Sequence, residues 1–152
     1  MDLSSLIEKY PEFFKDSQHD YGCGPGWYPL IEAVCSYVKN KQNRYLSLKH
    51  PINEHVTCGK SNLPFVDFKF EQIKEKFGSL RLYHLLSKVK HDWTIYDEVK
   101  YEYDFQITFG AVNGFTDAIE MISNTTCEKC GAPGRSRYGG WIKVLCDNCC
   151  KK

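Results

Sequence analysis

Three stretches of the chain carry apolar side chains at every third or fourth position, which is the spacing of a helix with one buried face. They lie near the N-terminus, across residues 27–39 and across residues 104–124. Pro11 interrupts the first stretch, which is therefore predicted to form a short helix or two turns with a kink. Gly110 and Gly114 weaken the third helix, and glycines four residues apart on a helix often mark the close approach of another element.

Alternating apolar and polar positions predict strands between these helices. Val66, Phe68 and Phe70 alternate with charged residues, as expected for a half-buried strand. The next residues predict a second strand that returns from a turn at 77–79, and a period of two within 93–103 predicts a third. The fold class is thus predicted to be α+β, with a small antiparallel sheet of two to four strands flanked by the second and third helices.

Cysteines are concentrated at the end of the chain, where five of the eight fall within residues 127–152. Two CxxC pairs lie there with the spacing of a four-cysteine zinc knuckle. The predicted ligands are Cys127, Cys130, Cys146 and Cys149. Because sulfur would fill all four positions of the tetrahedron, zinc is predicted to be a structural cofactor and not a catalytic one. Cys150 is an alternative to Cys149 as the fourth ligand.

The other three cysteines point less clearly to a role. Cys23 and Cys35 are predicted to be buried thiols and not metal ligands. A second metal site at His50, His55 and Cys58 stays open, because their spacing matches no established ligand pattern.

The start of the chain bears on where the protein works. It is acidic and amphipathic, without the basic start and apolar stretch of a signal peptide. No apolar run approaches the roughly 18 residues needed to cross a bilayer. The protein is therefore expected to be cytoplasmic, a setting in which clustered cysteines favour a metal over disulfides. We expect one structural unit, an α+β domain at 1–125 with the knuckle at 126–152 packed on it.

Charge is balanced overall but not locally. The 152 residues include 20 Lys and Arg against 19 Asp and Glu, which argues against a generally basic coat for nucleic acid. Residues 65–90 carry a net charge of +3 and residues 127–152 carry +4, whereas residues 92–120 carry −6. Zinc with four thiolates contributes about −2 and offsets part of the positive charge at the C-terminus.

The two positive segments hold the candidate ligand-binding residues. Guanidinium groups bind phosphate oxygens bidentately, and aromatic rings stack on bases. A phosphate-bearing ligand is therefore predicted, with zinc shaping the loop between the cysteine pairs. The alternative is that Trp141 and Phe77 belong to the core, while the basic residues pair with Glu71, Glu75 and the acidic segment at 92–120. The candidates are Lys74, Lys76, Arg81, Tyr83, Arg135, Arg137, Tyr138 and Trp141.

No catalytic pattern is found in the sequence. It contains no Ser-His-Asp order in a strand–turn–helix context, no HExxH and no phosphate-binding loop of the Walker type. A Cys–His hydrolase would need an identifiable base, and the five histidines have no carboxylate partner at a useful spacing. The protein is therefore expected not to be an enzyme.

Three spaced motifs stand out in the sequence: GPGWYPLI at 24–31, IKEKFGSLRLY at 73–83 and CEKCGAPGRSRYGGWIKVLCDNC at 127–149. Together they resemble a family of small uncharacterised proteins that is common in bacteriophages and prophages. The glycines of the first motif predict a tight loop before the second helix. Ser79 stands where family members usually have a second glycine, and the last metal ligand, here Cys149, varies in the family.

The resemblance implies a phage setting in the cytoplasm of a host cell. Phages favour small proteins that disarm host defences, so the expected role is anti-defence, by sequestering a cyclic nucleotide immune signal, with a homo-oligomer as the expected form. A zinc-ribbon regulator that binds nucleic acid is the alternative, and a protein adaptor that inhibits a host enzyme is a third function. A steep loss of affinity with salt would distinguish a nucleic-acid strand from a compact nucleotide.

Overall fold

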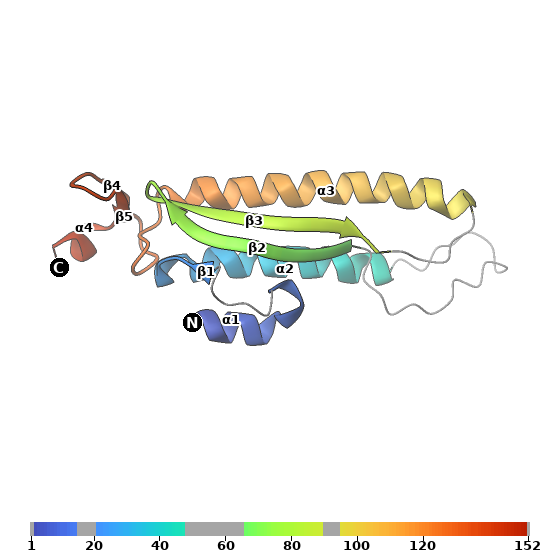
Figure 1. The fold of residues 1–152 in the computed structure, drawn as a ribbon, viewed down its shortest axis with the longest axis horizontal. Helices are drawn as coiled ribbons and strands as arrows, with labels where there is room; N and C mark the ends of the chain where they lie inside the picture. The colour runs from blue at the N-terminus through green and yellow to red at the C-terminus, as the bar shows by residue number, and fades with distance from the viewer. Residues whose placement is uncertain (1, 15–20, 48–65, 90–94, 152) are drawn as a thin grey trace.

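A computed structural model of the chain describes residues 2–14, 21–47, 66–89 and 95–151. Its helices are α1 (Leu3–Lys9), α2 (Tyr28–Ser47), α3 (Ile95–Ser123) and α4 (Asp147–Cys150). Its strands are β1 (Tyr21–Gly22), β2 (Val66–Lys76), β3 (Ser79–Lys88), β4 (Arg135–Arg137) and β5 (Lys143–Leu145). Figure 1 shows an elongated molecule in which the β2–β3 turn and the last three elements lie at the same end. The predicted α+β class is confirmed.

The central hairpin forms as its alternating pattern predicts. β2 and β3 pair antiparallel, and the turn between them holds Phe77 and Gly78 at positive φ. The short strand β1 pairs parallel with β2, so the sheet is mixed and not purely antiparallel. The direction of β1 follows from the connection, because α2 carries the chain between β1 and β2, as a helix does in a parallel crossover.

The third strand predicted within 93–103 is wrong. Residues from Ile95 onwards form the first turns of α3, while residues 93 and 94 lie outside the described part of the chain. Ile95, Val99 and Tyr103 are spaced by four, a spacing that satisfies a period of two and also one face of a helix. The stretch continues directly into the helix predicted from residue 104, and extending an existing helix is far easier than starting a new element.

The core lies between one face of the sheet and the helices. Phe13, in a 3-10 turn at Pro11–Phe13, packs edge-on against Phe68 with 5.4 Å between ring centroids. Tyr37 of α2 stacks on Phe115 of α3 at 4.3 Å. In the described part of the chain, the largest fully buried side chains are Trp27, Phe13, Phe68, Phe70, Leu6, Ile31, Ile73, Leu80, Val34, Val38 and Val66. Helix α1 and the 3-10 turn that follows it confirm the kink predicted at Pro11.

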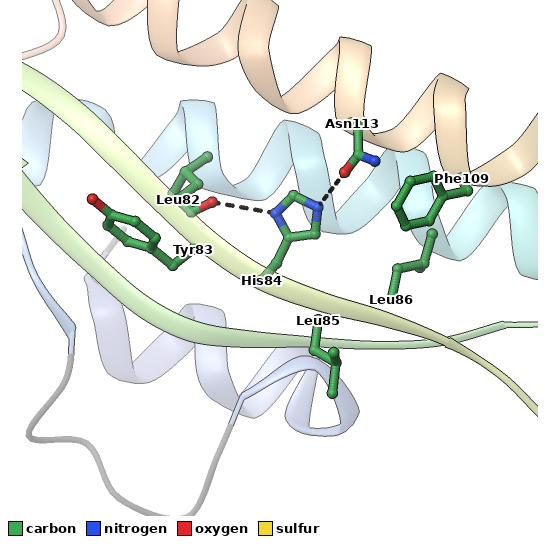
Figure 2. A pocket seen from close by; sticks show the side chains of 7 residues that line it. All are labelled: Leu82, Tyr83, His84, Leu85, Leu86, Phe109 and Asn113. Atoms are coloured by element: carbon green, nitrogen blue, oxygen red, sulfur yellow. Dashed lines mark hydrogen bonds between the residues drawn. The ribbon is translucent and has the colours of Figure 1, made fainter.

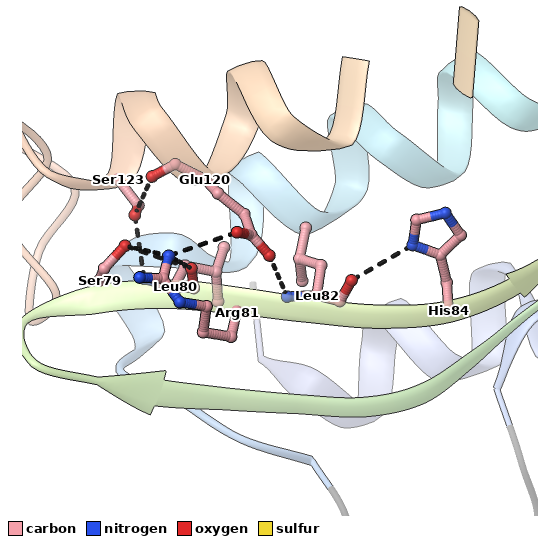
Figure 3. A network of polar contacts seen from close by, with 7 residues as sticks. All are labelled: Ser79, Leu80, Arg81, Leu82, His84, Glu120 and Ser123. Carbon is pink, nitrogen blue, oxygen red and sulfur yellow. Dashed lines mark hydrogen bonds and ion pairs between the residues drawn. The ribbon is translucent and has the colours of Figure 1, made fainter. Parts of the chain in front are cut away.

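Helix α3 covers the outer edge of β3 with side-chain hydrogen bonds. The N–H of Leu80 donates to Ser123 Oγ at 2.9 Å, and the N–H of Leu82 donates to Glu120 Oε1 at 2.6 Å (Figure 3). An edge strand otherwise presents unpaired N–H groups, so these bonds hold β3 against α3. None of the described helices is both long and apolar enough to cross a membrane.

Candidate functional site

Four cysteine sulfurs converge at the end of the molecule where α3 leaves the sheet. β4 and β5 pair antiparallel and bring the two CxxC turns together. The ligand atoms of Cys127, Cys130, Cys146 and Cys149 all lie within 4.8 Å of one another, and the Sγ atoms of Cys130 and Cys146 are 3.7 Å apart. Sulfurs bound to one tetrahedral zinc at about 2.3 Å stand about 3.8 Å apart. The four predicted ligands thus form a cluster of the right size for one metal ion, with Cys149 and not Cys150 in the fourth position.

Hydrogen bonds favour the thiolate form of one of these sulfurs. Burial opposes a negative charge on Cys127, but backbone N–H groups of Cys146, Cys130 and Lys129 outweigh it and lower the pKa of the Cys127 thiol to about 6. Contacts with the sulfurs of Cys146 and Cys130 act in the opposite direction on Cys149 and raise its pKa to about 12. Because a metal binds the thiolate form, an ion must displace the protons that the cluster still holds.

The GPGW loop before α2 fastens the cysteine cluster to the core. The N–H of Gly26 donates to the carbonyl of Glu128 at 2.8 Å, and the indole Nε1–H of Trp27 donates to the carbonyl of Thr126 at 2.8 Å. A Cβ on Gly26 would lie 2.1 Å from the carbonyl oxygen of Cys127, so only glycine permits this approach. We call the contact of Gly26 and Trp27 with residues 126–128 the knuckle seat.

Sequence reasoning missed the knuckle seat, although it singled out the loop as a tight turn. The available signal was a glycine followed directly by a tryptophan at the start of a helix. The partner of Trp27 lies 99 residues further along the chain, and no local pattern connects the two.

The four candidate ligand residues on the hairpin share one side of it. Lys74 stands opposite Arg81 in the β2–β3 ladder, and alternation places Lys76 and Tyr83 on the same side. The ammonium Nζ of Lys74 lies 4.7 Å from the centroid of the Tyr83 ring. Two cations and an aromatic ring are thus grouped on the hairpin before any ligand binds.

Arginine candidates form ion pairs, as the alternative prediction allowed. Arg81 reaches Glu120 of α3 at 3.3 Å (Figure 3), which lies in the acidic segment named as a partner. Arg135 and Arg137 both contact Asp147 of α4, a partner that the prediction did not include. Arg137 also donates to the carbonyl of Leu145 in β5 and so holds β4 and β5 together. Arg135 stays mostly exposed.

A tryptophan joins the knuckle to the hairpin. Trp141 Nε1–H donates to Glu75 Oε2 at 2.7 Å, and Glu75 Oε1 accepts from the N–H of Gly78 at 2.5 Å. Trp141 is nevertheless 70% exposed, Tyr138 82% and Phe77 72%. The alternative that Trp141 and Phe77 belong to the core is therefore wrong. The β2–β3 hairpin and the loop between the two CxxC pairs thus meet at this end of the molecule, and their aromatic rings are open to solvent.

Replacing Trp141 by alanine is expected to leave the free energy of unfolding nearly unchanged. Truncating a core tryptophan costs about 3–5 kcal/mol, whereas surface substitutions usually stay within about 0.5 kcal/mol. Urea unfolding followed by circular dichroism measures the difference. Trp27→Ala is the matched control and should show the full loss, because Trp27 is buried. Equal destabilisation by the two variants would contradict the exposed position of Trp141.

Cys23 and Cys35 are not members of the four-cysteine cluster. Cys35 is buried, as predicted, and Cys23 is half-buried. Burial raises the pKa of each thiol to about 12, which opposes the thiolate form that a metal binds. Within the described ranges, the four-cysteine cluster is the one group of three or more side chains arranged to hold a metal. His50, His55 and Cys58 lie outside those ranges.

A groove of about 410 Å³ lies between β3 and α3, beside Tyr83. Figure 2 shows His84 at its centre, with Nδ1 3.2 Å from the carbonyl oxygen of Leu82 and Nε2 3.0 Å from Asn113 Oδ1. The lining residues are Leu82, Tyr83, His84, Leu85, Leu86, Phe109 and Asn113. None of them is a lysine or an arginine, so the groove does not supply the cations that a phosphate needs.

Comparisons with known protein families, with curated proteins and with solved structures found no match to this chain. The resemblance to the phage family therefore stays a prediction. Function has to be inferred from the chemistry of the cysteine cluster and of the residues around the β2–β3 turn.

Proposed function

We propose that the cysteine cluster binds one zinc ion with a structural role. Four sulfurs from two CxxC turns match the preference of zinc for tetrahedral thiolate sites and leave no coordination position for a substrate. The knuckle seat supports the structural role, because it ties the first CxxC pair to the start of α2.

We propose further that the protein is a non-enzymatic binding protein for a phosphate-bearing ligand, active in the cytoplasm of a host cell. Its ligand-binding region is the hairpin–knuckle surface, defined as Lys74, Lys76, Arg81, Tyr83, Arg135, Arg137, Tyr138 and Trp141. The observation that carries the proposal is the pairing of Lys74 with Arg81 across the ladder, next to the Tyr83 ring. The Cβ atoms of cross-strand neighbours lie about 5 Å apart. A phosphate that replaces Glu120 as the partner of Arg81 could therefore contact both that cation and Lys74, while a ring stacks on its base.

The openness of this surface favours an extended ligand. Rings as exposed as Tyr138 and Trp141 do not wall a pocket, whereas cations interleaved with exposed rings are typical of surfaces that bind single strands. Short single-stranded nucleic acid is therefore the ligand that we propose first. The nearly balanced total charge fits contact with a few phosphates and not with a long track.

A cyclic nucleotide immune signal is the second candidate, with sequestration as an anti-defence function. It is favoured by the motif resemblance and by the close grouping of Lys74, Arg81 and Tyr83, which suits a single phosphate with its base. A compact ligand needs a concave pocket, so a second subunit would have to supply the wall that the open surface lacks.

A salt titration is expected to separate the two ligands. Affinity for a fluorescent oligothymidine should fall with salt with a slope of about −0.7 per phosphate neutralised. Lys74→Ala should weaken binding at every salt concentration and make the slope shallower by about 0.7, since it removes one phosphate contact. Lys39→Ala is the matched control, because Lys39 is paired with Glu12 away from the hairpin. Fluorescence anisotropy between about 50 and 200 mM salt measures both quantities.

Three outcomes would decide the function. No retention of the oligonucleotide at about 50 mM salt would exclude the strand. A cyclic dinucleotide that binds with a shallow salt slope, and fails to bind after Lys74→Ala, would establish the second candidate. Failure of both ligands would remove the hairpin–knuckle surface as a phosphate site. Native mass spectrometry of the purified protein would report metal, subunit number and any copurified nucleotide together.

A further inference from the structure

One side of α3 is apolar although it faces away from the core. Tyr103 is 67% exposed, Ile107 53% and Met121 71%. Gly110, Gly114 and Ala118 lie between them and are also exposed. Each of these six residues is three or four positions from the next, so they form one stripe along the helix. In Figure 1 no labelled element covers α3 on the side away from the sheet. We call this stripe the outer face of α3; it consists of Tyr103, Ile107, Gly110, Gly114, Ala118 and Met121.

The two glycines of the outer face have no structural role within the described residues. A Cβ on Gly110 or Gly114 would meet no atom within 4 Å, in contrast to Gly26 in the knuckle seat. Glycine weakens a helix relative to alanine, and its usual compensation is the close approach of another backbone. A helix that is apolar on its outer side as well as on its core side needs a second surface to cover it.

We infer that the outer face of α3 binds the same face of a second copy of this chain, with the two helices antiparallel. The face is small at its centre and large at both ends, so it is complementary to itself. A two-fold axis between Gly110 and Gly114 places Tyr103 opposite Met121 of the second copy, and the helices approach most closely at the glycines. Such a self-matching patch is what a two-fold dimer interface requires.

Charge supports a second copy in the antiparallel arrangement. The outer face carries no charged side chain, and Asp117 stands at its border. A parallel pair would bring both copies of Asp117 to the same level of the interface. An antiparallel pair places Asp117 beside Gln106 of the second copy. The two helix dipoles then point in opposite directions, which is the favourable arrangement for neighbouring helices. The antiparallel pair also places the two positively charged C-terminal segments, residues 127–152 of each copy, at opposite ends of the dimer.

The size of the face sets the expected affinity. From Tyr103 to Met121 the helix runs about 27 Å, which offers less than the roughly 800 Å² per partner of a standard interface. A dimer that dissociates in the micromolar range is therefore expected. The interface lies on α3 and does not use the hairpin–knuckle surface, so it does not depend on the identity of the ligand.

Sedimentation velocity over a range of protein concentrations tests the interface. The unmodified chain should show a monomer–dimer equilibrium. Gly114→Leu should weaken the dimer roughly 10- to 100-fold by overfilling its centre, while the monomer melts at the same or a higher temperature because the new side chain meets open space. Ile107→Glu should also give monomers. Leu85→Glu is its matched control, because Leu85 on β3 is similarly exposed at 56% but lies off the face.

The sign of a charge at residue 106 tests the antiparallel arrangement. Gln106→Lys should strengthen the dimer a few-fold, since the lysine would lie beside Asp117 of the second copy, and Gln106→Glu should weaken it by a similar factor. Equal effects of the two variants would overturn the antiparallel pairing. A monomer at all concentrations, or a dimer that survives Gly114→Leu and Ile107→Glu, would overturn the inference as a whole.

Discussion

Replacing Cys127 by serine is expected to abolish metal binding and to unfold at least residues 126–151. Binding energy at a structural zinc site is folding energy, about 10–16 kcal/mol in zinc-finger peptides. The strands β4 and β5 are three residues each and offer little other support, with Val144 and Leu145 as their buried apolar side chains. Metal content by native mass spectrometry and melting by circular dichroism measure the two effects.

Cys146→Ser should behave in the same way, since it removes a ligand from the other CxxC pair. Cys150→Ser is the matched control, because Cys150 is exposed and lies outside the cluster. That variant should keep one metal per chain and the melting temperature of the unmodified protein. A metal-free protein with unchanged stability after the Cys127 or Cys146 substitution would contradict a stabilising role for the metal.

Gly26→Ala is expected to destabilise the protein strongly. The added Cβ would lie 2.1 Å from the carbonyl oxygen of Cys127 and 2.4 Å from the N of Gly131, so the first CxxC turn must move away from α2. That movement breaks the bonds of Gly26 to Glu128 and of Trp27 to Thr126. Each buried polar group left without a partner costs about 1–3 kcal/mol, so a loss of roughly 3 kcal/mol or more is expected in urea unfolding.

Gly22→Ala provides the comparison. Gly22 lies four residues earlier, in β1, and a Cβ there would meet nothing within 4 Å. Its substitution should change the free energy of unfolding by no more than about 0.5 kcal/mol. If both glycines tolerated alanine equally, the knuckle seat would not be a tight contact and would not hold the four-cysteine cluster against α2.

Local patterns were sufficient for the elements whose contacts are close in sequence. The β2–β3 hairpin follows from alternation around Phe77 and Gly78, and the four-cysteine cluster follows from CxxC spacing. The stretch at 95–103 could not be assigned from its pattern, because residues four apart satisfy a helix and a strand equally. The stretch is helical because it continues directly into the helix that follows. A short window of sequence does not contain that information.

The candidate ligand residues show the same division. Alternation alone places Arg81 and Tyr83 on one side of β3, whereas the register of β3 with β2 is needed to place Lys74 opposite Arg81. The exposure of Trp141 could not be predicted, because a tryptophan between two CxxC pairs is as compatible with burial as with exposure. Asp147 was likewise missed as the partner of Arg135, since only the antiparallel pairing of β4 with β5 brings α4 beside the arginines.

Binding of the proposed zinc ion would link, through the knuckle seat, the lifetime of the protein to the supply of metal. Trp27 is the largest fully buried side chain among the described residues, and its indole N–H donates to the carbonyl of Thr126, directly before Cys127. A chain that fails to capture its ion would therefore loosen the start of α2 as well as its own C-terminus. Proteases act on such opened forms, so in a zinc-starved cell newly made chains would be degraded, and the amount of protein would follow zinc availability as well as its rate of synthesis.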